Sequence, residues 1–438
     1  MVIIALDAGT TSVRAVAYDA AGARLTWAGH PLTQHYPRPG WVEHDAEEIL
    51  AASARVLIDV SRDPRCAGEQ VVGITNQRET VVVWERASGR PIHRAIVWQD
   101  RRTAEVCRNL RGSGLEPEIA ARTGLLLDPY FSATKIAWIL DQVPGARVRA
   151  DRGELLAGTV DAWLVWKLTN GQVHATDPTN ASRTLLYDLK AGDWAGDLCE
   201  RFAVPRRLLP GIRPSGGDFG RIDVNLLPAA PPVRAVLGDQ QAAALGQACV
   251  TPGTVKATYG TGCFVLLHTG GDIVTSRQRL LGTVALGAGA ATTYALEGSI
   301  FNAGTVVQWL RDEMGLIADA AASAEAAASV VDTGGVYLVP AFTGLGAPWW
   351  DADARGLVCG ITRGTTKAQI VRAGLESVAY QTEDLLEAMR ADGGTIDRLR
   401  VDGGMVANDW FCQFLADQLA VVVERPVDIE TTVRGAAV

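Results

Sequence analysis

One pattern occurs twice in this chain: an apolar strand, a glycine–threonine turn and a second apolar strand. Residues 2–18 read VIIALDAGTTSVRAVAY, and residues 256–267 read KATYGTGCFVLL. Two apolar runs joined by a short turn predict a β-hairpin in each place. The repeat constrains the fold, because a duplicated hairpin indicates two similar halves that face each other across a cleft. The alternative is a chance similarity of two glycine-rich hairpins.

The first turn suits a phosphate group. Successive backbone N–H groups and hydroxyls, here from Gly9 to Ser12, form a concavity that binds anions. Asp7 ends the preceding strand, where a magnesium ion on those phosphates would meet a carboxylate directly or through water. The alternative is an ordinary surface hairpin with a polar turn.

Composition narrows the class of protein. The chain has 438 residues, of which 48% are hydrophobic and 21% are charged, so it can bury the cores of two large or three small domains. A net charge of −8 argues against broad binding of nucleic acid or of an anionic membrane. The sequence predicts neither a membrane span nor a signal peptide. Seven scattered cysteines without a C-x-x-C pair are typical of reduced thiols, which favours a cytoplasmic location.

Strand and helix patterns alternate along the chain, which predicts an α/β fold. Buried strands are expected at 71–75, 81–84, 95–98, 233–237, 336–339, 399–402 and 421–424. The strand at 81–84 is expected to continue the strand at 71–75 or to pair with it. Helices are expected at 46–60 (with Asp45 as cap), 102–111, 134–142, 241–248, 305–312, 320–329, 367–390 and 407–419. The predicted domains are residues 1–245 and 246–438.

Two polar clusters follow apolar strands in the first half. Arg78 and Glu79 are adjacent opposite charges between runs that look buried, and buried charges need partners. They either form structural ion pairs or bind a hydroxylated ligand, since arginine donates hydrogen bonds and glutamate accepts them. Trp98 ends a later strand and is either part of the core or an apolar wall for the carbon chain of such a ligand.

Two turns further along the chain also allow two interpretations. Asp239 stands between a strand and a helix, so it is either an N-cap or a general base at the mouth of a cleft. Gly403 and Gly404 end the strand at 399–402. A glycine pair there leaves room for a flat ligand against the backbone, or merely connects two elements.

Together these segments resemble the FGGY carbohydrate kinases of the actin-like ATPase superfamily, and among them the members that phosphorylate glycerol. The resemblance runs from Val2 to Ala437 and rests on motifs in the family's order: DAGTTSVR (7–14), NQRET (76–80), WQDRR (98–102), DPYFSATK (128–135), GDQQ (238–241), YGTGCF (259–264), QWLRD (308–312) and GLGAP (344–348). It implies two ribonuclease-H-like α/β domains around a cleft. It also implies phosphorylation of glycerol to sn-glycerol 3-phosphate with ATP and Mg²⁺.

The resemblance further implies a role for each matching residue. Asp239 matches the general base, and Asp7 and Asp239 match the carboxylates near the magnesium. The glycerol-binding positions are matched by Arg78, Glu79, Trp98, Tyr130, Asp239, Gln240 and Phe264. The positions that contact the nucleotide and its phosphates are matched by Thr10, Thr11, Ser12 and Arg14 in the first domain and by Thr261, Gly304, Gln308, Gly404 and Asn408 in the second.

Some expectations stay open at this point. Family members continue with further helices after the position of Val438, so we expect the second domain to be incomplete at its C-terminal end. Two alternatives stand beside glycerol phosphorylation: another FGGY kinase for a different polyol or ketose, and an ATP-binding protein of the same fold with little activity. The matches to the glycerol-binding set disfavour the first. The expected partners are glycerol and ATP/ADP, without nucleic acid or membrane insertion, and homo-oligomerisation is left open.

Overall fold

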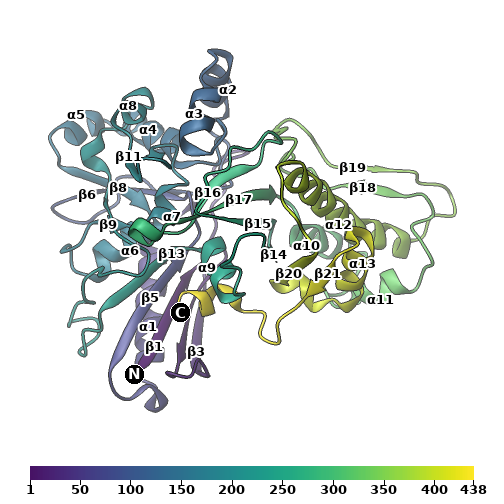
Figure 1. The fold of residues 1–438 in the computed structure, drawn as a ribbon, viewed down its shortest axis with the longest axis horizontal. Coiled ribbons are helices and arrows are strands. Elements are labelled where there is room, and N and C mark those ends of the chain that lie inside the picture. Colours follow the sequence, from purple (N-terminus) through teal and green to yellow (C-terminus); the bar gives the residue numbers. More distant parts are fainter.

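The computed structural model describes all residues 1–438, which form two α/β domains (Figure 1). The first domain is built on a five-stranded sheet with the order β13-β5-β1-β2-β3. Its strands are β1 (Val2–Ala8), β2 (Ser12–Tyr18), β3 (Arg24–Pro31), β5 (Gln70–Asn76) and β13 (Val233–Gly238). Since β1 pairs antiparallel with β2 and parallel with β5, the first hairpin turn and the end of β5 lie at the same edge of the sheet.

The second domain repeats this plan in a six-stranded sheet with the order β16-β17-β15-β14-β20-β21. Its strands are β14 (Val255–Tyr259), β15 (Cys263–Gly270), β16 (Leu281–Leu286), β17 (Thr293–Ile300), β20 (Arg398–Asp402) and β21 (Val422–Glu424). The hairpin β14–β15 takes the place of β1–β2, and β20 runs parallel to β14 as β5 does to β1. The predicted two-domain α/β fold with a duplicated hairpin is confirmed.

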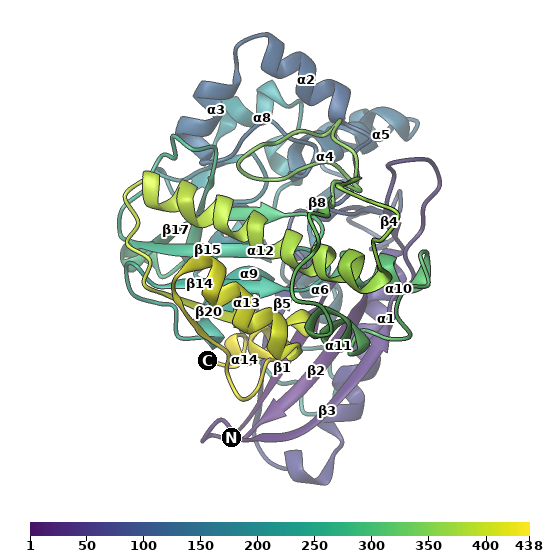
Figure 2. The same cartoon turned by 90° about the vertical axis from the view of Figure 1, so that its right-hand side faces the viewer.

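Helices cover both sheets. In the first domain α1 (Ala46–Ser61) packs on β1, β2 and β3, and its predicted cap is present, because the Asp45 carboxylate accepts a hydrogen bond from the N–H of Glu47 at 2.9 Å. In the second domain α12 crosses the sheet beside α13 (Figure 2). The helices there are α10 (Gly304–Asp312), α11 (Ala322–Ala328), α12 (Lys367–Ala391) and α13 (Asp409–Leu419), and β18 (Tyr337–Val339) and β19 (Leu357–Cys359) form a small hairpin.

The remaining elements of the first half include a four-stranded antiparallel sheet with the order β4-β7-β6-β8, which we call the four-stranded subdomain. The expectation that residues 81–84 extend or pair with the strand before them is wrong, because β6 pairs with β7 and β8. The reason is the turn at Glu79, whose φ of 57° redirects the chain out of the first sheet. These elements are β4 (Glu43–His44), β6 (Val81–Glu85), β7 (Ala95–Ile96), β8 (Leu155–Thr159), β9 (Ala175–Thr176), β10 (Tyr187–Asp188), β11 (Asp193–Trp194), β12 (Gly211–Ile212), α2 (Ala104–Gly112), α3 (Glu116–Thr123), α4 (Ser132–Gln142), α5 (Ala146–Asp151), α6 (Val160–Leu168), α7 (Pro178–Ala181) and α8 (Gly196–Arg201).

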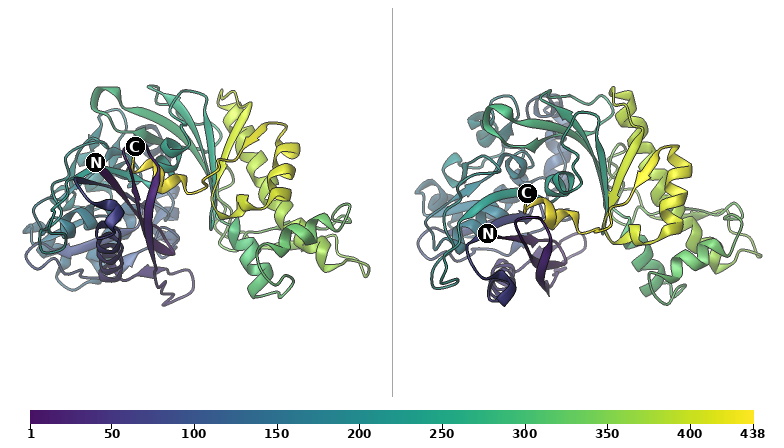
Figure 3. Two further views of the ribbon diagram at one scale, coloured as in Figure 1. Left: turned by 90° about the horizontal axis from the view of Figure 1, so that it is seen from below. Right: turned by 60° about the horizontal axis from the view of Figure 1, so that its bottom comes forward.

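The C-terminal segment returns from the second domain to the first, as Figure 3 shows. Its helix α14 (Thr431–Gly435) packs against α9 (Asp239–Gly246) and β1. Val433 and Ala436 are buried with Ala5, Val16 and Tyr18 of the first sheet. A five-residue helix is unstable by itself, so this packing against the first domain is what holds α14 in place. No helix in the structure is both long and apolar enough to cross a membrane.

Candidate active site

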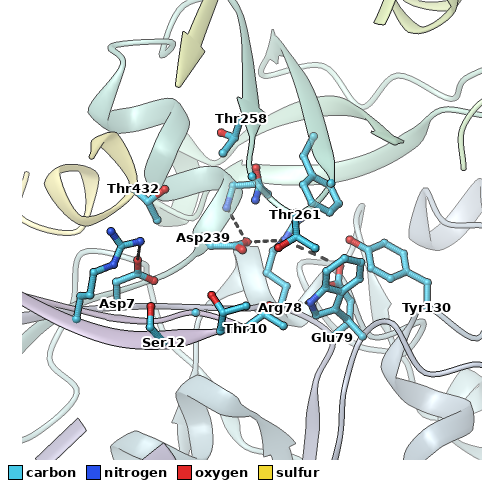
Figure 4. A pocket seen from close by; sticks show the side chains of 18 residues that line it. Asp7, Thr10, Ser12, Arg78, Glu79, Tyr130, Asp239, Thr258, Thr261 and Thr432 are labelled. Atoms are coloured by element: carbon cyan, nitrogen blue, oxygen red, sulfur yellow. Dashed lines mark hydrogen bonds and ion pairs between the residues drawn. The ribbon is translucent and has the colours of Figure 1, made fainter. Parts of the chain in front are cut away.

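A cavity lies where the two hairpin turns approach each other between the domains (Figure 4). The turn after β1 and the turn after β14 form opposite walls, the start of α9 forms the floor, and segments of the four-stranded subdomain close one end. The cavity is lined by Asp7, Gly9, Thr10, Thr11, Ser12, Arg14, Arg78, Glu79, Trp98, Tyr130, Asp239, Gln240, Thr258, Gly260, Thr261, Gly262, Phe264 and Thr432.

Two arginines and two glutamates form a buried ionic network behind one end of the cavity. Arg78 donates hydrogen bonds from both of its terminal nitrogens to Glu297 on β17, at 2.6 and 3.1 Å. Arg183 links the two glutamates, because its Nη2 donates to Glu297 Oε1 at 2.8 Å and its Nε donates to Glu79 Oε1 at 2.7 Å. Burial opposes the charge of Glu297, but Arg183 and Arg78 overcome this penalty and hold its pKa at about 2. Arg78 and Glu79 are therefore ion-paired as well as exposed to the cavity. Their binding of a hydroxylated ligand stays a prediction.

Asp239 lies at the first position of α9, and Gly238 is the N-cap. The Asp239 carboxylate consequently stays available to the cavity, where its Oδ1 atom lies 3.2 Å from Nε of Arg78. Burial raises the pKa of Asp239, while the charges of Arg78 and Lys256 oppose this rise. A carboxylate with a raised pKa at the mouth of a cleft is suited to accept a proton.

Three aromatic rings form an apolar wall beside these charges. The Trp98 ring centroid lies 5.7 Å from that of Tyr130 and 5.7 Å from that of Phe264, edge to face in both pairs. Because Phe264 comes from β15, this contact links the two domains. The indole Nε1–H of Trp98 donates to Thr10 Oγ1 at 2.9 Å, which joins the aromatic wall to the first hairpin turn. Carbon atoms of a small ligand can pack here while Arg78, Glu79 and Asp239 bind its polar atoms.

A buried lysine supports the floor of the cavity. Lys256 on β14 has no exposed surface, and its Nζ donates to Gln240 Oε1, to Thr258 Oγ1 at 3.0 Å and to the carbonyl of Phe264 at 3.3 Å. The lysine therefore fixes Gln240 against the second hairpin. Its positive charge also faces Asp239, on which it acts electrostatically.

The opposite end of the cavity suits an anion. Gly9, Thr10, Thr11 and Ser12 present hydroxyls and backbone N–H groups from the first turn, and Gly260 to Gly262 face them from the second. Arg14 supplies a positive charge, with one terminal nitrogen 2.5 Å from Glu430 and another 3.9 Å from Asp7. Burial raises the pKa of Asp7 to about 7, against the charge of Arg14. A cation near this carboxylate would favour its ionised form.

A second cavity continues from the first into the second domain and shares Gly260 and Thr261 with it. Its walls combine apolar groups such as Leu375 and Trp410 with polar groups such as Gln308 and Asn408. Gly304 opens α10 directly beneath the hairpin turn, where a Cβ atom would lie 2.5 Å from the carbonyl oxygen of Gly260. A flat apolar ring fits such a cavity, with an anionic chain extending toward the two hairpin turns.

The carboxylates suit a magnesium ion that arrives with phosphates. The structure holds no cluster of three or more His, Cys, Asp or Glu side chains that could form a complete protein-built metal centre. Asp7 and Asp239 both line the cavity, and their charges act on each other. Magnesium typically binds through one or two carboxylates together with waters and substrate phosphates, so this donor set fits it.

The structure brings together every site residue that the sequence predicted. All predicted glycerol-binding and phosphate-contacting residues line the first cavity, and Thr261, Gly304, Gln308, Gly404 and Asn408 line the second. Their binding roles stay predictions. Sequence reasoning missed Arg183, Glu297 and Lys256, each of which is fully buried and charged. A signal existed for Glu297, a lone carboxylate in the strand TYALEGSI, since a charge in an apolar strand needs a partner.

Comparison with known proteins agrees with this geometry. Residues 2–246 match the N-terminal domain of the FGGY family of carbohydrate kinases, and residues 255–438 match its C-terminal domain. A glycerol kinase from Methylobacterium nodulans is 56% identical over 99% of this chain and 88% of its own length, and one from Alcanivorax borkumensis is also 56% identical with the same coverage.

Among solved structures, a glycerol kinase from Plasmodium falciparum with ADP superposes with a TM-score of 0.90 at 36% identity, covering 100% of this chain and 88% of that one. A xylulose kinase from Lactobacillus acidophilus superposes with a TM-score of 0.88 at 19% identity, covering 99% of this chain and 88% of that one, and so shares the fold. The matches of both domains and the identity to these relatives place the chain in a family: it belongs to the FGGY family of carbohydrate kinases.

Proposed function

We propose that this protein transfers the γ-phosphoryl group of ATP to glycerol and forms sn-glycerol 3-phosphate and ADP. The observation that carries the proposal is the single cavity in which Arg78, Glu79, Trp98, Phe264 and Asp239 meet the turns of both hairpins. A small polyol needs donors, acceptors and an apolar wall at this end, and its hydroxyl must lie beside the phosphates at the other. The identity of 56% to glycerol kinases supports the choice of acceptor.

The proposed reaction is an in-line displacement at phosphorus. The Asp239 carboxylate accepts the proton of a primary hydroxyl of glycerol as that oxygen forms a bond to the γ-phosphorus. The bond from the γ-phosphorus to the bridging oxygen breaks, and ADP leaves with the electron pair. Hydroxyls and N–H groups of the two hairpin turns stabilise charge on the transferring group.

Magnesium and closure of the domains complete the proposal. Mg²⁺ would be held by Asp7 and Asp239, largely through water, and would supply positive charge to the phosphates. Closure of the cleft would exclude water, which otherwise competes with glycerol as the acceptor.

A coupled assay of ADP release tests the acceptor directly. The panel is glycerol, dihydroxyacetone, erythritol, xylulose and water, each with ATP and Mg²⁺. We expect kcat/KM to be highest for glycerol, with little release of ADP in water alone. A preference for xylulose or erythritol would assign the site to another acceptor, and ATP binding without turnover of any acceptor would make this a non-catalytic member of the family.

The proposal extends to the cellular compartment and to the oligomeric state of the protein. All seven cysteines are free and five are buried, which supports a reducing compartment, and we assign the cytoplasm. Cell fractionation with antibody detection would test this assignment. A homo-oligomer stays a prediction, which sedimentation velocity of the purified protein would test.

A further inference from the structure

The main chain at Glu79 adopts a strained turn. Glu79 has a φ of 57°, which is uncommon for a residue other than glycine. The N–H of Thr80 donates to the carbonyl of Arg78 at 2.6 Å, so the three residues form a γ-turn with positive φ at its centre, the rarer and more strained kind. Such strain persists only where the surrounding structure holds it. This turn carries the two charged side chains, Arg78 and Glu79, that line the polyol end of the cavity.

The first turn of α4 holds this γ-turn from behind. Ser132 Oγ donates to the carbonyl of Glu79 at 3.1 Å, and Lys135 Nζ donates to the same carbonyl at 3.3 Å. Both side chains are fully buried. Two donors on one carbonyl fix the orientation of the peptide that follows Glu79, and thereby the direction in which the Glu79 side chain leaves the backbone.

Lys135 also reaches the two other segments that form the polyol end. Its Nζ donates to the carbonyl of Tyr130 at 2.7 Å and to the carbonyl of Val97, the residue before Trp98, at 3.4 Å. One ammonium group thus binds the main chains that carry Glu79, Trp98 and Tyr130. Burial lowers the pKa of Lys135 to about 7, while the nearby charges of Glu79 and Asp100 oppose this fall. The three carbonyls keep the buried amine hydrogen-bonded only while the three segments stay together.

We propose that Lys135 is a positioning residue for the polyol site, which holds the main chains of Glu79, Trp98 and Tyr130 in the arrangement that binds the acceptor. The inference rests on the proposed function of this cavity. Lys135 does not line the cavity itself, so it acts through the residues that do. Its loss should weaken binding of the acceptor selectively, because the nucleotide cavity lies in the other domain.

The test compares Lys135→Met with a matched control, Ile139→Ala, one turn further along α4. Ile139 is fully buried and apolar, so its truncation lowers stability without removing a hydrogen bond. We expect Lys135→Met to raise the KM for the acceptor at least about tenfold while the KM for ATP changes less than about threefold. Ile139→Ala should lower the melting temperature and leave both KM values near those of the wild type.

Ser132→Ala provides a milder variant in case Lys135→Met does not fold. It removes only one donor to the Glu79 carbonyl, so a smaller rise in the acceptor KM is expected. The acceptor in all assays is the one that the wild type turns over best. If that acceptor is not glycerol, the proposed function fails, but the ratio of variant to wild type still tests Lys135. The inference is overturned if the lysine and serine variants lose stability only, with the acceptor KM unchanged.

Discussion

Replacing Glu297 by glutamine tests whether the buried ionic network organises the polyol site. Glu297 comes from the second domain, whereas Arg78 and Arg183 come from the first, and it accepts hydrogen bonds from both at 2.6 to 3.1 Å. A glutamine has the same shape but no charge. Its amide group also turns N–H donors toward one of the two guanidinium groups, so at least one charged hydrogen bond is lost.

The pKa of Glu297 gives the size of the effect. The fall of this pKa from the ordinary value of 4.5 to about 2 corresponds to about 3 kcal/mol in the free energy of unfolding, at about 1.4 kcal/mol for each pKa unit. This agrees with the roughly 3–5 kcal/mol by which removal of one partner of a buried ion pair destabilises a protein. For a chain whose stability changes by about 3 kcal/mol per molar urea, we expect the unfolding midpoint to fall by about 1 M.

The assay is urea unfolding of the wild type and of Glu297→Gln, followed by calorimetric titration with glycerol. Because Arg78 loses its main partner, we expect the Kd for glycerol to rise at least about tenfold. The control is Glu376→Gln on α12, which breaks a 2.7 Å ion pair with Arg372. Neither residue lines the cavity, so this variant should leave glycerol affinity unchanged. If Glu297→Gln behaves like this control in both measurements, the network does not organise the site.

Three further predictions follow from the same geometry. Gly304→Ala places a Cβ atom 2.5 Å from the carbonyl oxygen of Gly260, so steady-state kinetics should show the KM for ATP rising at least about tenfold with the KM for glycerol nearly unchanged; equal changes would contradict the assigned nucleotide cavity. Phe264→Ala removes the ring that packs 5.7 Å from Trp98, and calorimetry should show weaker glycerol binding by about tenfold, with no change meaning that the wall is only structural. Since the pKa of Glu297 is lowered, the contribution of this carboxylate to stability is present above about pH 4.5 and is lost as the pH falls toward about 2. Urea unfolding midpoints across this range should therefore fall more steeply for the wild type than for Glu297→Gln. Parallel curves would refute the lowered pKa of Glu297.

Local signals made much of the fold predictable. The two hairpins follow from apolar runs around short turns, and α1 follows from its cap at Asp45. The strand at 81–84 pairs with other strands than its pattern predicts, because the strained turn at Glu79 depends on donors from α4, which is distant in the sequence. Hydrogen bonds from a distant helix cannot be predicted from the local sequence pattern around Glu79.

In the candidate site, too, local motifs were predictable and contacts between distant segments were not. The resemblance to the family identified many of the residues that line the two cavities, since most of them lie in motifs that are contiguous in the sequence. Arg183 and Glu297 escaped prediction because their pairing depends on how the two domains face each other, and the residues are more than a hundred positions apart. Lys135 lies within a matched motif, but its three carbonyl partners appear only when three separate segments meet.

Turnover of Asp239→Asn with glycerol, ATP and Mg²⁺, measured as both ADP and glycerol phosphate, tests whether Asp239 is the general base. The variant keeps the shape of the side chain at the start of α9 but cannot take the hydroxyl proton. We expect the wild type to form the two products in equal amounts. The variant should still bind ATP and lose a factor of roughly 10²–10⁴ in kcat. Near-normal formation of glycerol phosphate by Asp239→Asn would contradict the role of this carboxylate as the general base.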